Sequence, residues 1–183
     1  MRVNRMATRI LCIGNEFVRD DGLGIRVGRV LASLPLPPEV TVVPAPQLGF
    51  DLLDEVASAD RLILVDAMKT DRPVGTCVTL EGRAIERYSA GASASHTLGI
   101  AELMELACTL APGRSPATLH FVGVEGRAFE DYGLGMTPEV EAAIPLAVAS
   151  VLRLLGANAD LLAAGQTAAL DEIANPKTMI GKR

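Results

Sequence analysis

Three side chains of types that bind divalent cations lie at expected strand ends or helix starts. Asp21 follows an apolar run at residues 10–13, and Asp66 ends a second run at residues 62–65. His96 comes just before a segment with helical spacing. Two carboxylates and one imidazole suit a borderline divalent cation and leave coordination positions open. If the fold brings them to one rim of a sheet, they predict a metal-binding site.

Each of these residues also has a purely structural interpretation. Asp20 and Asp21 could cap the following helix and complement its dipole, which is the interpretation we favour for Asp20. For Asp21 the spacing supports the cap and the ligand equally. Asp66 could simply open a loop, and His96 could be a solvated or capping histidine in a Ser-rich segment. His120, inside an expected strand, is interpreted as structural.

Other catalytic patterns are missing from the sequence. Seven residues separate Gly14 from Gly22, so the dinucleotide-binding glycine pattern fails. There is no Walker A pattern, nucleophile-elbow serine or His-Glu-x-x-His. The three cysteines are an odd number without Cys-x-x-Cys spacing, which argues against a disulfide framework or a thiolate zinc site. We interpret Cys12, Cys77 and Cys108 as small buried hydrophobes of a cytoplasmic protein.

The elements that would position these residues follow from the hydrophobic pattern. Apolar runs alternate with segments whose apolar residues recur at helical spacing. Alternating strands and helices predict a three-layer α/β fold, with a mostly parallel sheet covered by helices on both faces. We expect strands at 8–13, 40–43, 62–66, 76–80 and 117–124, and helices at 23–34, 50–56, 97–110 and from 138 onward. In such a sheet the carboxyl ends of the strands share one edge, so Asp21, Asp66 and His96 could meet there.

Length and charge restrict the possible classes of protein. The 183 residues fit one domain able to bury roughly two-thirds of its unfolded surface. We assign residues 1–156 to one α/β domain. Residues 157–183 form an Ala-rich C-terminal tail, expected to be partly helical or disordered, with one loose helix and a frayed end.

A net charge of −5 argues against nucleic acid or an anionic membrane as partner. No apolar run is long enough to cross a bilayer, and the N-terminal residues do not read as a signal peptide.

Five short motifs are informative through their common order and spacing. They are Gly14-Asn15-x4-Asp20-Asp21-Gly22-x-Gly24, Val65-Asp66-Ala67, Ser95-His96-x2-Gly99, Gly123-Val124-Glu125 and Gly133-Leu134-Gly135-Met136-Thr137-Pro138-Glu139-Val140. Together they resemble the [NiFe]-hydrogenase maturation proteases over roughly residues 8–155. The chain departs from many relatives at Cys12, where they carry a glycine, and at Asp21, where some carry glutamate. The tail has no counterpart in the family.

The resemblance implies a fold, an activity and a set of site residues. The fold is a twisted, phosphorylase/hydrolase-like α/β sheet flanked by helices. The activity is that of an endopeptidase, which removes the C-terminal extension of the hydrogenase large-subunit precursor after nickel insertion. The family's metal-binding positions fall on Asp21, Asp66 and His96, which we also take as the catalytic residues. The precursor's nickel would be recognised rather than permanently held, and another divalent cation could bind in vitro. We expect a monomer.

Two alternatives to this function stay open. The chain could be a non-catalytic assembly chaperone that binds the nickel site, or a metallopeptidase with its own zinc. The attacking group is also open, with water preferred to a carboxylate base. Neither Ser95 nor Cys12 has the partners that a nucleophile requires.

Overall fold

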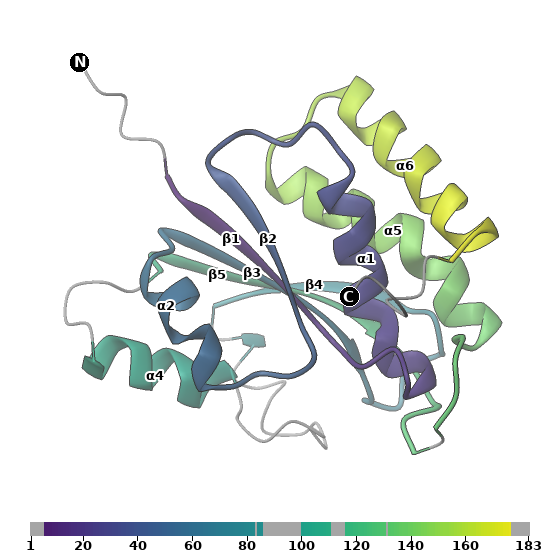
Figure 1. The fold of residues 1–183 in the computed structure, drawn as a ribbon, viewed down its shortest axis with the longest axis horizontal. Coiled ribbons are helices and arrows are strands. Elements are labelled where there is room, and N and C mark those ends of the chain that lie inside the picture. Colours follow the sequence, from purple (N-terminus) through teal and green to yellow (C-terminus); the bar gives the residue numbers. More distant parts are fainter. Residues whose placement is uncertain (1–5, 83, 86–99, 111–115, 131, 177–183) are drawn as a thin grey trace, which may run out of the picture.

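The computed structural model describes residues 6–82, 84–85, 100–110, 116–130 and 132–176. The predicted alternation of strands and helices is confirmed (Figure 1). In chain order the elements are β1 Thr8–Ile13, η1 Arg19–Gly22, α1 Leu23–Ala32, β2 Val40–Ala45, η2 Phe50–Leu52, α2 Leu53–Ala57, β3 Arg61–Met68, β4 Cys77–Glu81, α4 Ile100–Leu110, β5 Thr118–Glu125, α5 Pro138–Leu154 and α6 Ala159–Ala174.

The five strands form one sheet in the order β2-β1-β3-β5-β4. The β1–β2, β1–β3 and β3–β5 pairs are parallel, and only the edge strand β4 runs antiparallel to its neighbour β5. The central strands are short runs of aliphatic residues buried on both faces, as expected for a covered parallel sheet. The mostly parallel sheet is therefore confirmed.

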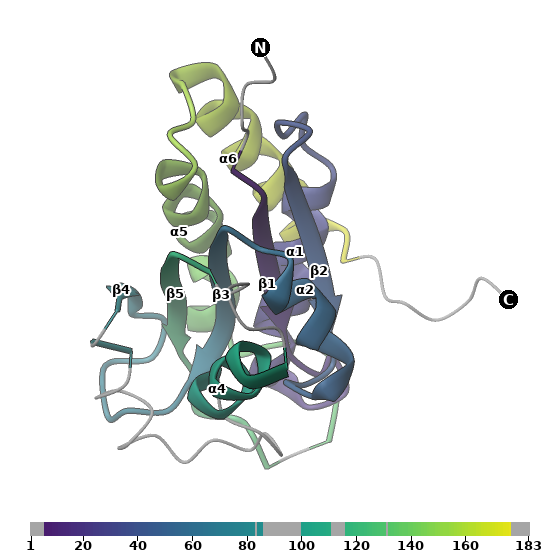
Figure 2. The same cartoon turned by 90° about the vertical axis from the view of Figure 1, so that its left-hand side faces the viewer.

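Helices cover both faces of the sheet and make three layers (Figures 1 and 2). Side chains alternate along β1, so Ile10 and Cys12 join one core while Leu11 and Ile13 join the other. The first core is closed by α1, α5 and α6, and the second by α2 and α4. Among the described residues, no helix combines the length and the apolar character needed to span a membrane.

The third strand is longer than predicted. We expected Asp66 to end it, but β3 continues to Met68 and pairs with β5 up to Glu125. Asp66 lies inside the strand, opposite Gly123. A single carboxylate does not stop backbone pairing when the neighbouring strand offers partners for two more residues. The prediction was wrong for the strand's end, and Asp66 is held more rigidly than a loop residue would be.

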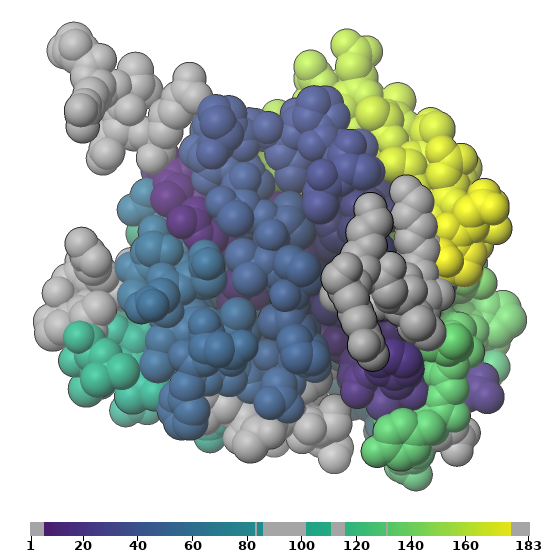
Figure 3. Space-filling view, in the orientation of Figure 1, coloured from purple at the N-terminus to yellow at the C-terminus, as the bar shows by residue number. Residues whose placement is uncertain are grey.

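The helix predicted after residue 156 is present, but it is packed rather than loose. It is α6, a 16-residue helix that packs against α5 and α1 and contributes the fully buried Ala169 to their common core. In the space-filling view the yellow surface of α6 is continuous with the body of the domain (Figure 3). The alanines that make the segment look featureless in sequence allow this close helix packing.

Candidate functional site

The strand order reverses direction between β1 and β3. From β1 the chain crosses to β2 on one side and then returns to β3 on the other side of β1. At such a switch point the connections leave the carboxyl ends of the two strands in opposite directions, which opens the crevice where α/β proteins bind ligands. Asp21 follows β1, and Asp66 lies two residues before the end of β3 at Met68, so both are positioned near this crevice.

Two glycines let the turn that carries Asp21 fold tightly against the sheet. Gly14 has a φ of +151°, and a Cβ built on it would lie 1.9 Å from the Asp21 carbonyl oxygen. A Cβ on Gly24 would lie 1.9 Å from the carbonyl oxygen of Ile13 and 2.7 Å from that of Val65. Only glycine fits at these positions. The turn therefore packs directly against β1 and β3, next to Asp66.

Asp21 and Asp66 are both buried, each with 7% of its surface exposed. The Asp21 Oδ2 accepts a hydrogen bond from the Asn15 backbone N–H at 2.9 Å. Its turn η1 contacts β3, the strand that carries Asp66. Two carboxylates held out of water near one crevice repel each other, and a cation brought between them would relieve that repulsion. The structure thus brings two of the three predicted ligands to the same edge of the sheet.

The predicted cap role of Asp20 was wrong. The N-cap of α1 is Gly22, and Asp20 lies one turn earlier, in η1. Its fully buried carboxylate accepts hydrogen bonds from the backbone N–H groups of Arg127, Ala128 and Thr137 at 3.0 Å or less. Asp20 therefore joins the turn to the loop between β5 and α5. Sequence spacing cannot reveal partners more than 100 residues away.

His96 lies outside the described residues, so its place in the site stays a prediction. Among the residues that the structure describes, no group of three or more His, Cys, Asp or Glu side chains could hold a metal. His120 lies in β5, so its predicted position inside a strand is confirmed.

The thiols of Cys12 and Cys77 show no sign of nucleophilic activation. Cys12 is buried, and burial raises the pKa of its thiol far above the usual range. Burial also raises the pKa of Cys77, partly offset by its hydrogen bond with Ser150. The prediction that all three are buried is confirmed for Cys12 alone, because Cys77 is partly buried and Cys108 is exposed.

Glu125 is a further buried carboxylate, for which the sequence suggested no role of its own. It is 2% exposed at the end of β5 and accepts hydrogen bonds from the Thr70 backbone N–H at 2.5 Å and the Thr70 hydroxyl at 2.6 Å. It thereby holds the start of the β3–β4 connection at the same edge as Asp66. In sequence it was marked by its place at the end of an apolar run and by the Gly123-Val124-Glu125 motif, neither of which shows that it binds Thr70.

Comparisons with known proteins agree with this architecture. The model of a family described as hydrogenase maturation protease matches residues 25–154. The chain is 31% identical over 153 residues to the hydrogenase 2 maturation protease of Escherichia coli K12, covering 82% of this chain and 91% of that protein.

Two solved structures show the same similarity in three dimensions. The hydrogenase-maturating endopeptidase HybD from E. coli superposes with a TM-score of 0.75 at 29% identity, over 82% of this chain and 93% of that one. The [NiFe] hydrogenase maturation protease HybD from Thermococcus kodakarensis gives a TM-score of 0.68 at 27% identity, over 81% and 99% of the two chains.

Proposed function

The chain belongs to the hydrogenase maturation protease family, whose members are peptide hydrolases, and on that premise we propose that it cleaves the C-terminal extension from a [NiFe]-hydrogenase large-subunit precursor. Nickel already held by the precursor is part of the substrate, and Asp21, Asp66 and His96 supply ligands to it. The observation that supports this proposal is the pair of buried carboxylates at the β1/β3 crevice.

The carboxylates and the histidine would recognise nickel by direct ligation, because oxygen and imidazole ligands suit this class of cation. Ligation fixes the precursor relative to the protease and so positions the scissile peptide bond. Water is the proposed attacking group: its oxygen bonds to the peptide carbon, the C–N bond breaks, and the leaving amine takes the proton that the water gives up. The nickel can polarise the peptide carbonyl or activate that water.

The test compares nickel-loaded and nickel-free precursor, each incubated with the protein and followed by mass spectrometry. We expect loss of the extension only from the nickel-loaded form. Equal cleavage of both forms would remove nickel recognition from the proposal, and cleavage of neither would remove the activity on this precursor. A stable complex without any loss of mass would instead indicate the assembly chaperone. Zinc at one equivalent in the purified protein would indicate the independent metallopeptidase.

Asp66→Asn isolates the chemistry, because it keeps the size of the side chain and removes its charge. We expect it to abolish cleavage of the nickel-loaded precursor. Asp60→Asn is the matched control, since Asp60 lies just before the opposite end of the same strand, where it accepts a hydrogen bond from the Ala7 N–H. Full activity of Asp66→Asn would contradict the proposed ligand.

We also propose that the protein acts in the cytoplasm and as a monomer. Cys12, Cys77 and Cys108 are free thiols, which persist in a reducing compartment. Fractionation of cells and the mass of the purified protein in solution test these two points.

A further inference from the structure

The C-terminal helix α6 lies beyond residues 25–154, the part matched by the family model, yet it is firmly packed. A Cβ built on Gly165 would lie 2.5 Å from the Leu152 side chain of α5, which shows how closely the two helices approach. Contacts between α6 and α1 complete the packing, and Figure 1 shows α6 beside both α1 and α5. The position of α6 relative to α1 is therefore well defined.

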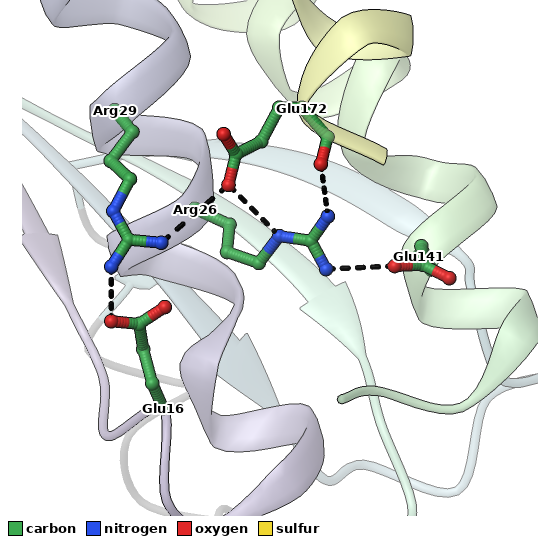
Figure 4. Close-up of polar contacts among 5 residues, drawn as sticks. All are labelled: Glu16, Arg26, Arg29, Glu141 and Glu172. Atoms are coloured by element: carbon green, nitrogen blue, oxygen red, sulfur yellow. Dashed lines mark hydrogen bonds and ion pairs between the residues drawn. The ribbon is translucent and has the colours of Figure 1, made fainter. Parts of the chain in front are cut away.

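Glu172, near the end of α6, forms ion pairs with two arginines of α1 (Figure 4). Its Oε1 lies 3.3 Å from Arg26 Nε and 3.5 Å from Arg29 Nη1. Arg26 also donates to the Glu172 backbone oxygen at 2.8 Å and to Glu141 Oε1 at 2.7 Å. Glu172 and Arg26 are 7% and 5% exposed. Charges buried to this degree are stable only when paired, so the pairs hold α6 and α1 in one arrangement.

The second arginine extends this network to the turn that carries Asp21. Arg29 Nη2 donates to the carboxylate of Glu16, which lies in the loop after β1. The preceding residue, Asn15, is the one whose N–H binds the Asp21 carboxylate at 2.9 Å. In addition, a Cβ built on Gly22 would lie 3.0 Å from the Glu16 Cα. The Glu16 backbone thus rests against the turn on which Asp21 sits.

We propose that Glu172, Arg29 and Glu16 form a brace through which α6 positions the Asp21 carboxylate. The three are positioning residues: they restrict the loop, and the Asn15 N–H then holds Asp21 in one orientation. The inference rests on the proposed function, because it takes Asp21 to be a ligand of the precursor's nickel. It gives the C-terminal helix a role in the proteolysis itself.

The test uses three variants of the full chain. Glu16→Gln and Glu172→Gln each break the brace at one end. Glu141→Gln is the matched control, because it removes an ion pair of Arg26 in the same network without touching Arg29 or Glu16. Two readouts are recorded: hydrogen exchange at the Asn15 amide, and kcat against KM for cleavage of nickel-loaded precursor.

With the brace broken, we expect faster exchange at the Asn15 amide and a kcat reduced about tenfold with little change in KM, since small misplacements of reacting groups cost this much or more. Glu141→Gln should keep both properties of the unaltered protein, even where its thermal midpoint falls. Brace variants that behave like Glu141→Gln in both readouts would overturn the inference. If Glu172→Gln fails to fold, Glu16→Gln decides, because it leaves both partners of Arg26 in place.

Asp21→Asn, measured in parallel, separates the brace from the proposed function. Full cleavage by Asp21→Asn would overturn the ligand role of Asp21 and hence the proposed function. Loss of cleavage in Asp21→Asn, together with unaltered kinetics and exchange in Glu16→Gln, would overturn the brace alone.

Discussion

The carboxylate of Asp20 binds Thr137 twice, across 117 residues of sequence. Its Oδ1 accepts the Thr137 backbone N–H at 2.7 Å, and its Oδ2 accepts the Thr137 hydroxyl at 3.2 Å. Thr137 is the N-cap residue of α5, so the carboxylate also lies at the positive end of that helix. The turn η1, which carries both Asp20 and Asp21, is thereby attached to the start of α5, the longest helix described.

We predict that Asp20→Asn lowers the free energy of unfolding by about 1.5–3 kcal/mol, the range for hydrogen bonds to charged groups. The asparagine NH2 group replaces one acceptor and would face backbone N–H groups that need an oxygen. Urea unfolding measures the loss. Asp71→Asn is the control, because Asp71 is an exposed turn residue at φ 61°, a conformation that asparagine tolerates. Equal stability of the two variants would contradict the structural role of Asp20.

Gly24→Ala should destabilise the protein by about 3 kcal/mol or more, as severe overpacking does. The added methyl group would meet the backbone oxygens of Ile13 and Val65, which belong to paired strands and cannot move aside. Gly135→Ala provides the comparison: its φ is +85° but no described atom lies within 4 Å of the added Cβ, so only about 1–2 kcal/mol of backbone strain is expected. A smaller effect at Gly24 than at Gly135 would show that the turn does not pack as described.

Stability should fall at alkaline pH because of Cys12. Burial raises the pKa of its thiol in the folded protein, whereas the thiol of the unfolded chain has a pKa of about 8.5. Below that pH both states keep the proton and Cys12 has no effect. Above it the unfolded state binds fewer protons, so the free energy of unfolding decreases by up to about 1.4 kcal/mol per pH unit.

Urea unfolding at about pH 7.5 and pH 9.5 tests this expectation, with Cys12→Ala as the control. Cys77 contributes in the same direction and remains in the control, so the difference between the two slopes belongs to Cys12. Identical slopes with and without Cys12 would contradict the prediction.

His96→Ala should reduce cleavage of nickel-loaded precursor by about 100-fold or more, because even residues that only support a metal ligand cost 10–100-fold. Stability should change by no more than about 0.5 kcal/mol, because the sequence predicts a loop position for His96 and substitutions away from a packed core cost little. His120→Gln, in β5, is the control for loss of a histidine elsewhere and should leave cleavage unchanged. Unfolding of His96→Ala at room temperature would make His96 a structural residue.

The sequence by itself determined the elements and their layering. The run at residues 8–13 is apolar after Arg9, and the structure places β1 at the same residues. Local patterns succeed here because burial and backbone hydrogen bonding impose a period that is readable within a few residues. The position of Asp21 between a strand and a helix is local in the same sense. The strand–helix alternation then predicts a mostly parallel sheet, in which such folds bind ligands at the strands' carboxyl ends.

Only the tertiary structure decided which distant groups meet. Asp20 reads as a helix cap, yet it binds a loop more than 100 residues away; Asp66 reads as a strand end, yet β5 extends the pairing past it. Glu172 lies in an unremarkable Ala-rich segment and pairs with Arg26 across 146 residues. These partners are selected by how helices and strands pack, and packing depends on the shape of the whole core rather than on the residues beside each charge.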